Sequence, residues 1–487
     1  MPKNSLATKL LKSSFWQYLS SWLDKLIGFI STIILARLLV PDDFGVIAAI
    51  SLVTGLFHVI ASVGTDRYLI RKLEINNYDL NTGWTVSIIM KALSGLGIYL
   101  LAETISEFMQ DSRLILALQV VSISQMLAGF SNIGMVLYEK EFKYRPQFIV
   151  KLISRLIAFV FKISFAIYFH SYWAFIFADL IENTTYVIGT FIAHPYRPRL
   201  SLANWKQQWL FSQWVLFKSI FVFLRFRIDT ILLSKYLPLE ALGTYTISKE
   251  LATLPSGEII DPVLRPLYVG LSEIHENPTA FADKIHKALC VLFLIVTPIS
   301  LGIYVTADNL VYVMLGEQWQ SAAPLVMTLS FMLLPGSLST FFTQALTAMG
   351  NVKLIFQFEL IFGIIMIVAF IVLAEGMQVD DFAFLRVVII SLNTLLELIM
   401  LTQLSHLSFF RICGLMCMPI FSAVTMVYAI IAVSFYITEF KPLIQLLIQV
   451  SMGVFIYLWL ISSFIYLMRN SFKEYQFVWK TFFYHHK

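Results

Sequence analysis

Long uninterrupted runs of apolar residues follow one another along the whole chain, separated by short polar breaks. Most runs hold about 20 residues, which is the length that a helix needs to cross about 30 Å of hydrocarbon. The strands of a membrane barrel alternate apolar and polar residues instead, so the runs favour helices. We therefore expect an all-α integral membrane protein with about fourteen spans. The expected spans are 13–36, 44–65, 82–102, 113–136, 148–169, 172–193, 209–236, 241–264, 286–306, 321–347, 354–374, 382–404, 414–436 and 442–468.

Composition supports the same class and narrows the possible functions. Of the 487 residues, 58% are hydrophobic and 13% are charged, whereas soluble domains carry about 25% charged residues. The three cysteines have no metal-ligand spacing, and the chain contains no nucleotide-binding glycine loop and no nucleophile elbow. We therefore expect no enzyme activity, no cofactor and no bound metal.

Basic residues are distributed unevenly between the polar breaks. With the expected spans, the segments on one side of the membrane hold about 22 Lys and Arg and those on the other side about five, and cytoplasmic loops are the ones enriched in these residues. Both termini are therefore expected to be cytoplasmic. The formal net charge of +5 reflects this topology and gives no reason to expect a nucleic-acid partner.

A segment near the N-terminus recurs in the middle of the chain. ISTIILARLLVPDDFG at 30–45 aligns without a gap with IDTILLSKYLPLEALG at 228–243, at a constant offset of 198 residues. An even number of expected spans separates the two copies, so both copies face the same way in the membrane. Parallel repeats of this kind build two bundles around a central cavity. We expect two six-helix lobes, 1–200 and 201–405, followed by two further helices and a cytoplasmic tail in 406–487.

Four segments of the chain resemble recurring segments of the polysaccharide transporters. This family of Wzx-like, lipid-linked oligosaccharide flippases belongs to the MOP (multidrug/oligosaccharidyl-lipid/polysaccharide) exporter superfamily. The segments are RLLVPDDFG at 37–45, GTDRYLIRK at 64–72, YEKEFKYR at 138–145 and QALTAMGNVK at 344–353. The chain departs from the usual family pattern after the eighth expected span, where it reads DPVLRPLYVGLSEI at 261–274.

The resemblance implies a function and a location. It implies a flippase that moves an undecaprenyl-pyrophosphate-linked oligosaccharide from the cytoplasmic to the periplasmic leaflet of a bacterial inner membrane by alternating access. The exported glycan would serve the synthesis of O-antigen, capsule or exopolysaccharide. The expected partners are this substrate, membrane lipids and a polysaccharide polymerase or export machinery, and the chain is expected to be a monomer. Two alternatives stay open: a multidrug or cation exporter of the same superfamily, and a membrane glycan polymerase.

Several basic residues fall inside the expected spans, where one charge costs roughly 2.5–3.5 kcal/mol. Lys218, Arg225 and Asp229 follow an i, i+7, i+11 spacing and form one stripe of the seventh helix. Lys25 borders a polar stripe of the first helix, and Lys91 lies in the third. Because Arg and Lys donors suit phosphate oxygens, these five residues are the predicted substrate-binding set. The alternative for Arg225 is an ion pair with Asp229 that only fastens the bundle.

Acidic residues inside the spans are candidates for coupling transport to an ion. Asp179 and Glu182 lie at i and i+3 on the sixth helix, Asp24 lies on the first, and Glu397 lies on the twelfth. Close carboxylates in apolar surroundings repel, which favours proton uptake by one of them. Solvation by the central cavity, or pairing with Lys or Arg, is the alternative. The membrane potential is another source of drive, because two negative charges moving outward gain about 4.6 kcal/mol at 100 mV.

Overall fold

The computed structural model describes most of the chain and divides it into two compact units. The units are residues 1–243 and 244–487. The described residues are 3–62, 64–256, 270–271, 277–405, 407–469 and 472–483. Throughout these residues the regular structure is helical, which confirms the all-α prediction. Most of the departing segment 261–274, including Arg265, lies outside the described residues, and the expected lobe boundaries at 200 and 405 stay a prediction.

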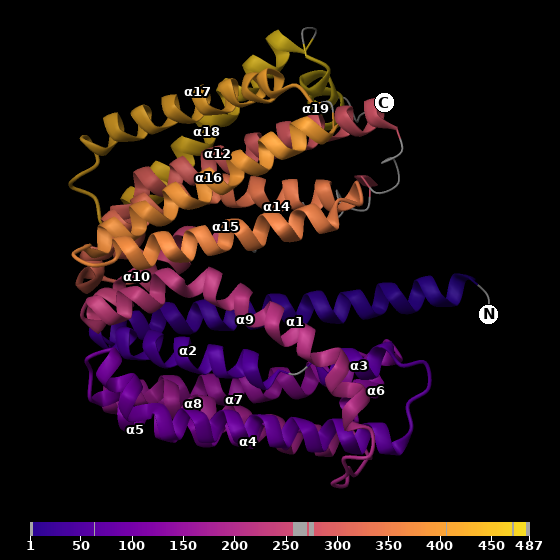
Figure 1. Ribbon diagram of the computed structural model, residues 1–487. Helices are drawn as coiled ribbons and strands as arrows, with labels where there is room; N and C mark the ends of the chain where they lie inside the picture. The colour runs from indigo at the N-terminus through magenta and orange to yellow at the C-terminus, as the bar shows by residue number, and fades with distance from the viewer. Residues whose placement is uncertain are drawn as a thin grey trace. The chain divides into compact units, whose positions relative to one another are not determined.

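Unit 1 is a bundle of long helices joined by short connections. Figure 1 shows five of them, α2, α4, α5, α7 and α8, running side by side. Within the bundle α5 packs against both α4 and α8, and α2 packs against α4, α5 and α9. The helices are α1 (Lys3–Leu38), α2 (Pro41–Ala61), α3 (Thr65–Arg71), α4 (Asn77–Phe108), α5 (Arg113–Ala128), α6 (Met135–Lys140), α7 (Arg145–Phe169), α8 (Trp173–Ala193), α9 (Trp205–Tyr236) and the first residues of α10 (Leu239–Pro255).

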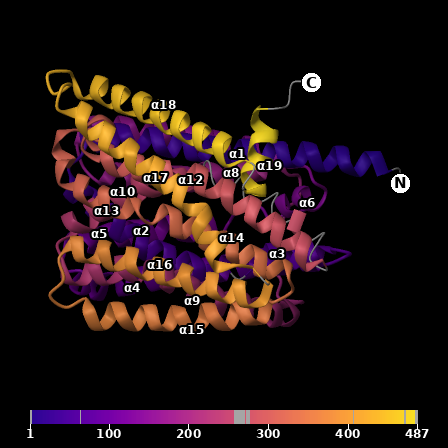
Figure 2. The same cartoon turned by 90° about the horizontal axis from the view of Figure 1, so that it is seen from above.

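Unit 2 is organised around one long helix, α12, which packs against α13, α14, α17 and α18 (Figure 2). The tenth expected span is interrupted, because α13 ends at Ser330 and α14 begins at Leu333. Pro335 explains the break, since its ring would clash with the carbonyl of Phe331 in a continuous helix. The elements are α12 (Pro278–Met314), η2 (Glu317–Ala322), α13 (Ala323–Ser330), α14 (Leu333–Ala348), α15 (Val352–Leu373), α16 (Val379–Ser405), α17 (Phe409–Ser434), α18 (Pro442–Met468) and α19 (Lys473–Phe483).

Every expected span overlaps a helix, and many of these helices can cross a membrane. Within the described residues, 11 helices are long and apolar enough to do so. The shorter α5, with 16 residues, and the helices α9 and α10 are not among them. The eighth expected span runs past the end of α10 into residues outside the described part. The chain is therefore a multi-pass membrane protein, and the count of fourteen stays a prediction.

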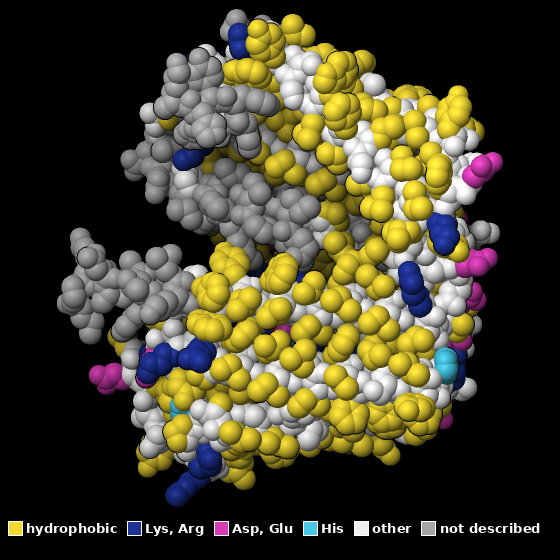
Figure 3. Space-filling model, turned by 180° about the vertical axis from the view of Figure 1, so that it is seen from behind, with side chains coloured by type: hydrophobic (Ala, Val, Ile, Leu, Met, Phe, Trp, Pro, Cys, Tyr) yellow, Lys and Arg dark blue, Asp and Glu magenta, His cyan; other side chains and the backbone are white. Residues whose placement is uncertain are grey.

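The surface of the described residues has the composition that lipid contact requires. On the face shown in Figure 3, hydrophobic side chains cover most of the coloured surface, and charged ones lie toward the two sides. Large apolar side chains stay strongly exposed, such as Ile192 at 82%, Phe455 at 71% and Val372 at 70%. Contiguous apolar surface of this kind marks an interaction with lipid or another apolar partner.

Arg113 joins the beginnings of α2 and α5 at one end of unit 1. Its Nη1 lies 2.5 Å from Oδ2 of Asp42, and its Nη2 lies 2.6 Å from Oδ2 of Asp111. Burial acts to raise the pKa of Asp111, but the hydrogen bonds from the side chain and backbone N–H of Arg113 outweigh it and hold the pKa below its ordinary value. The α4–α5 connection is thereby fixed to the start of α2.

The duplicated segment has the same local structure in both copies. α1 ends at Leu38 and α2 begins at Pro41, while α9 ends at Tyr236 and α10 begins at Leu239, which preserves the offset of 198 residues. The turn hydrogen bonds also recur. The backbone N–H of Leu39 donates to Leu35 over 2.8 Å, and the equivalent N–H of Leu237 donates to Leu233 over 3.0 Å. These matches support the sequence duplication at the level of single bonds.

Candidate functional site

A polar cavity of about 610 Å³ lies inside unit 1. Its walls come from α2, α4, α5, α7 and α8, so helices distant in sequence contribute to one site. The charged side chains that line it are Lys91, Arg155, Lys162, Asp179 and Glu182. Charges at this position in a helix bundle are costly unless they are paired, hydrogen-bonded or hydrated. The cavity is therefore the candidate functional site.

Asp179 is held in the cavity by two neutral hydrogen-bond donors. The Oγ of Ser124 on α5 lies 2.5 Å from its Oδ2, and the Nδ2 of Asn183 lies 3.3 Å from the same atom. Asn183 also donates to the Ser124 Oγ over 2.9 Å. Because both donors are uncharged, they orient the carboxyl group without supplying a counterion for it.

Glu182, one turn further along α8, has a cationic partner instead. The Nη1 of Arg155 on α7 lies 3.0 Å from its Oε2 and 3.1 Å from its Oε1. The two side chains keep 33% and 28% of their surfaces exposed. This partial exposure leaves the ion pair open to the cavity, where another anion can compete for the guanidinium.

The remaining basic side chains make weaker contacts. The Nζ of Lys91 donates to the backbone oxygen of Ala128 over 3.0 Å, and the Nζ of Lys162 lies 4.8 Å from the ring centre of Phe175. A carbonyl and a π-face attract a cation but do not neutralise it. Lys91 is also attracted by the carboxylate of Asp66, which does not line the cavity. After Arg155 is matched by Glu182, the charged lining holds two lysines and one carboxylate, Asp179. The electrostatic balance of the lining is therefore positive.

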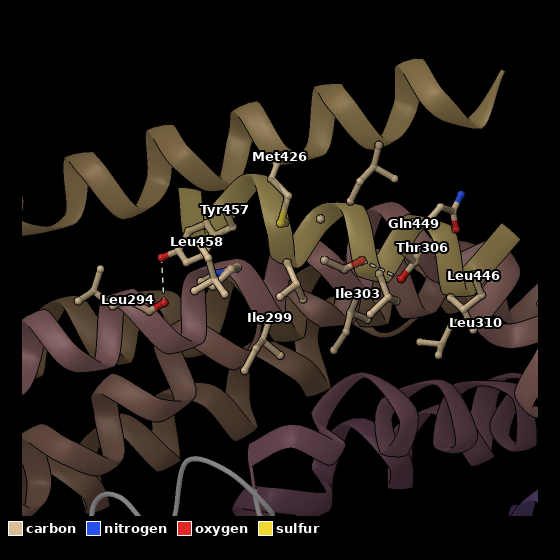
Figure 4. Close-up of a pocket in the computed structure, with 16 residues that line it drawn as sticks. Leu294, Ile299, Ile303, Thr306, Leu310, Met426, Leu446, Gln449, Tyr457 and Leu458 are labelled. Carbon is tan, nitrogen blue, oxygen red and sulfur yellow. Dashed lines mark hydrogen bonds between the residues drawn. The ribbon is translucent and has the colours of Figure 1, made fainter. Parts of the chain in front are cut away.

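A second cavity, of about 450 Å³, lies inside unit 2 and has a different character. It is lined by residues of α12, α17 and α18, and Figure 4 shows Met426, Ile299 and Ile303 around it. The hydroxyl of Tyr457 donates to the backbone oxygen of Leu294 over 2.8 Å, as the dashed line in Figure 4 marks. The described residues that line this cavity include no charged side chain.

Comparison with known proteins places the chain in a family. Residues 34–324 match the family model described as "Polysaccharide biosynthesis protein", which covers more than half of the chain. The chain belongs to this polysaccharide biosynthesis family. Its membership confirms the resemblance seen in the four sequence segments.

Individual relatives are distant in sequence. The chain is 26% identical over 339 residues to an uncharacterized membrane protein in the cps region of Klebsiella pneumoniae, covering 69% of both chains. It is 22% identical over 359 residues to the lipopolysaccharide biosynthesis protein WzxC of Escherichia coli K12, covering 73% of both. Among solved structures, the lipid II flippase MurJ in an inward closed conformation shares the fold with a TM-score of 0.75. That alignment is 13% identical and covers 93% of this chain and 98% of MurJ.

The structure groups three of the sequence-predicted residues of this family member in one cavity. Lys91 was expected to bind substrate, whereas Asp179 and Glu182 were expected to couple an ion, and all three line the polar cavity of unit 1. Asp24 lies elsewhere, on α1, where it pairs with Lys151 of α7. Pairing was the alternative for these acids, and it is the arrangement seen for Asp24 and Glu182.

The other predicted basic residues do not line this cavity. Lys25 on α1 and Lys218 on α9 are exposed, and Arg225 is half-buried with its guanidinium carbon 5.2 Å from the ring centre of Phe226. Asp229 is fully buried, and its Oδ1 accepts from the backbone N–H of Thr230 over 2.9 Å. A common hollow for Lys25, Lys218 and Arg225 stays a prediction.

Glu397 lies in unit 2 in surroundings similar to those of Asp179. It is buried on α16, and its Oε1 accepts from the Nδ2 of Asn393 over 3.0 Å. The same amide nitrogen lies 3.2 Å from the Oγ of Ser339 on α14. Each of the two acids therefore shares an asparagine with a serine from a neighbouring helix.

The sequence interpretation missed Arg155 and Lys162. A signal for them exists, because Lys151, Arg155 and Lys162 follow an i, i+4, i+11 spacing and form one stripe of α7. Ser124 and Asn183 carry no comparable signal, since single small polar residues are common in membrane helices and only their neighbours in space give them a role.

Proposed function

We propose that this protein is a flippase that moves an undecaprenyl-pyrophosphate-linked oligosaccharide from the cytoplasmic to the periplasmic leaflet by alternating access. The glycan would serve surface polysaccharide synthesis, as O-antigen, capsule or exopolysaccharide. The observation that carries the proposal is the polar cavity in unit 1, whose lining holds Lys91, Arg155 and Lys162 together with the carboxylates of Asp179 and Glu182. A cationic cavity in a membrane protein suits an anionic head group that must leave water.

Family membership supports this substrate class. The family is described by its role in polysaccharide biosynthesis, and a relative matched over 73% of its length is named for lipopolysaccharide biosynthesis. The fold is shared with a protein named as a lipid II flippase. A lipid-linked glycan fits all three descriptions, because it is a polysaccharide precursor that has to cross the bilayer with a charged head group.

In this proposal the basic residues hold the pyrophosphate. Lys91 and Lys162 supply mobile point charges, and Arg155 supplies a planar fork that can exchange Glu182 for a phosphate oxygen. Lys25, Lys218 and Arg225 would serve the same role along α1 and α9, with Asp229 orienting the α9 stripe. The sugars enter the water-filled path, while the polyprenyl tail stays in lipid.

Coupling is assigned to the acids. Asp179 takes up a proton, because its two neutral donors leave it the least compensated carboxylate in the cavity. Glu182 can take up a proton only after Arg155 leaves their ion pair and moves to the substrate. Asp24, already paired with Lys151, and Glu397 are secondary candidates. The membrane potential adds about 4.6 kcal/mol per two negative charges moved outward at 100 mV.

The rival functions need different sites. An exporter of organic cations needs a cavity with excess negative charge, and the positive lining disfavours it. A glycan polymerase needs a catalytic constellation outside the membrane, which the sequence does not indicate. We further propose that the chain is a monomer in the bacterial inner membrane, with both termini cytoplasmic, acting beside a polymerase or export machinery.

The test follows lipid-linked glycan in each leaflet of cells depleted of the protein. We expect the glycan to accumulate on the cytoplasmic side, and the double variant Lys91→Ala/Lys162→Ala, present at normal level in the membrane, to reproduce the block. Lys473→Ala serves as the control, because it removes an exposed lysine far from the cavity in sequence. Normal export in depleted cells would rule the proposal out.

A further inference from the structure

A groove of about 550 Å³ lies between α7 and α8 in unit 1, where the two helices run side by side (Figure 1). Its walls are apolar over most of their length, with Ile149 and Ile153 on α7 and Ile188 and Ile192 on α8. All four isoleucine side chains are exposed, so the groove is open to the surroundings of the unit. Among the described residues, none lines both this groove and the polar cavity. The groove is therefore a separate site.

The shape of the groove follows from one close approach of the two helices. A Cβ placed on Gly189 of α8 would lie 2.8 Å from Cγ1 of Val150 on α7, so the helix surfaces meet there and the exposed isoleucines stand on either side. Along α7 the lining runs from Arg145 to Ser154, which is about 14 Å at 1.5 Å per residue. One leaflet contributes about half of the 30 Å of hydrocarbon in a bilayer. The groove therefore has the length of one acyl chain in a single leaflet.

One end of the groove is basic. Arg145, the first residue of α7, lines it and is exposed. Arg197, also exposed, follows the end of α8, where its Nη1 donates to the backbone oxygen of His194 over 2.8 Å and to that of Tyr196 over 3.0 Å. Neither arginine forms an ion pair with another described residue. Because α8 ends beside the beginning of α7, the two guanidinium groups lie at the same end of the groove.

The acid in the connection before α7 does not cancel this charge. Glu141 is already matched by Lys143, whose Nζ lies 2.6 Å from its Oε2. The end of the groove therefore keeps two arginines for an external anion. Arginine presents a planar fork of donors that suits phosphate oxygens, and basic residues beside a membrane attract anionic lipids.

We propose that this groove binds an anionic phospholipid, with its phosphate held by Arg145 and Arg197 and one acyl chain lying between the isoleucine walls. The expected topology places the beginning of α7 on the cytoplasmic side, so the lipid belongs to the cytoplasmic leaflet. A zwitterionic lipid fits less well, because its ammonium group offsets the phosphate charge and meets two more cations. A polyprenyl chain is several times longer than the groove. The site is thus distinct from the one proposed for the transported substrate.

A lipid in this position also braces the polar cavity from behind. Ser154 and Thr185 line the inner end of the groove. Ser154 directly precedes Arg155, and Thr185 lies three residues after Glu182. An acyl chain that fills the groove therefore packs against both helices that carry the Arg155–Glu182 ion pair. Because the lipid binds only the folded protein, it should raise the Tm.

The first experiment measures lipid binding to the purified full-length protein in detergent by native mass spectrometry, with dioleoylphosphatidylglycerol and dioleoylphosphatidylcholine as probes. We expect the native protein to bind the anionic lipid more tightly, and Arg145→Gln/Arg197→Gln to bind it about tenfold to thirtyfold more weakly. Arg199→Gln/Lys206→Gln is the matched control, because it removes the same charge from exposed positions that do not line the groove. Equal affinity of the native protein for both lipids, or equal losses in both double variants, would overturn the proposal.

The second experiment uses the native protein and so does not depend on how a variant folds. A phosphatidylglycerol that carries a photoactivatable diazirine on its acyl chain is added to the protein in phosphatidylcholine vesicles. We expect cross-links in 145–154 and 185–193, at a yield at least about fivefold above that of a phosphatidylcholine probe with the same chain. Cross-links spread evenly over the exposed helices, or equal yields for the two probes, would refute the site. Displacement of the probe by undecaprenyl phosphate would assign the groove to a polyprenyl chain and overturn the proposal as well.

Discussion

The side chains that give unit 1 its character are held by their neighbours rather than by their own helix. Arg155 and Glu182 come from α7 and α8 and meet at 3.0 Å, and Asp179 takes a hydrogen bond from Ser124 on α5. Such contacts in a poorly hydrated site fix side-chain geometry, and losing one partner leaves the other uncompensated. The cavity is therefore sensitive to single substitutions.

Glu182→Gln tests whether the ion pair supports the fold. The substitution removes the counterion of a half-buried guanidinium, so we expect a loss of about 1–3 kcal/mol in stability. The double variant Arg155→Gln/Glu182→Gln should regain most of that stability, because two amides can hydrogen-bond. We expect this double variant to lose glycan export, because it lacks the guanidinium proposed to bind phosphate. Thermal unfolding in detergent measures the first effect, with Glu107→Gln, an exposed acid, as control. A double variant that exports normally would remove Arg155 from the mechanism.

Asp111, just after the C-terminal end of α4, gives a pH-dependent prediction. Its pKa is lower in the folded protein than in the unfolded chain, so its contribution to stability is fully present above the unfolded value of about 3.9 and is lost as the pH falls through the folded value. The Tm difference between the native protein and Asp111→Asn should therefore be constant from about pH 5 to 8 and shrink below about pH 4. A difference that grows toward acid pH would contradict this assignment.

At the residue level, the sequence singled out side chains whose charge stands alone in an apolar run, and the roles predicted for them stay a prediction. Lys91, Asp179 and Glu182 were recognisable by that contrast, and the stripe of Arg155 and Lys162 was available in the same way. Their convergence on one cavity could not be derived, because it depends on how α4, α7 and α8 pack. From the sequence, Lys91 was assigned to substrate binding and Asp179 to ion coupling, although the two residues lie in one cavity.

At the scale of elements, hydrophobic periodicity determines most of the architecture. Each long apolar run became a helix because a backbone in lipid must satisfy its own hydrogen bonds. The interruption between α13 and α14 required attention to Pro335, and α19 was not expected because its apolar and polar residues alternate around the helix. Amphipathic segments of this kind give no long apolar run to detect.

An ion pair between an exposed and a buried side chain joins helix α19 to α17 within unit 2. The Nη2 of Arg411 lies 2.8 Å from Oε1 of Glu474, and their side chains are 40% and 0% exposed. We expect Arg411→Gln to lower the free energy of unfolding by the larger amount, roughly 3–5 kcal/mol, because it leaves the buried carboxylate of Glu474 without a counterion. Glu474→Gln should lower the free energy of unfolding by less, since the partly exposed side chain of Arg411 can be hydrated instead. Thermal unfolding of the two variants decides, and a larger loss for Glu474→Gln would contradict the burial-based argument.

For the whole molecule, the duplicated segment connects the sequence to the fold. The turns after α1 and α9 match bond for bond, and the equivalent glycines of the two copies, Gly45 and Gly243, lie at backbone distance from each other. The duplication was visible in the sequence because glycine, proline-adjacent residues and charge recur at one offset. The direct contact between the copies was not visible, since spacing along the chain gives no distance in space.

The most direct measurement reconstitutes the purified protein in liposomes and follows an undecaprenyl-pyrophosphate-linked oligosaccharide from one leaflet to the other. The account predicts that the native protein flips this lipid, and that Lys91→Ala/Lys162→Ala, folded with a similar Tm, is at least about tenfold slower, as expected when roughly 1.4 kcal/mol of interaction with the diphosphate is lost. Equal flipping rates for the native protein and this variant would contradict the claim that the cationic cavity carries the head group.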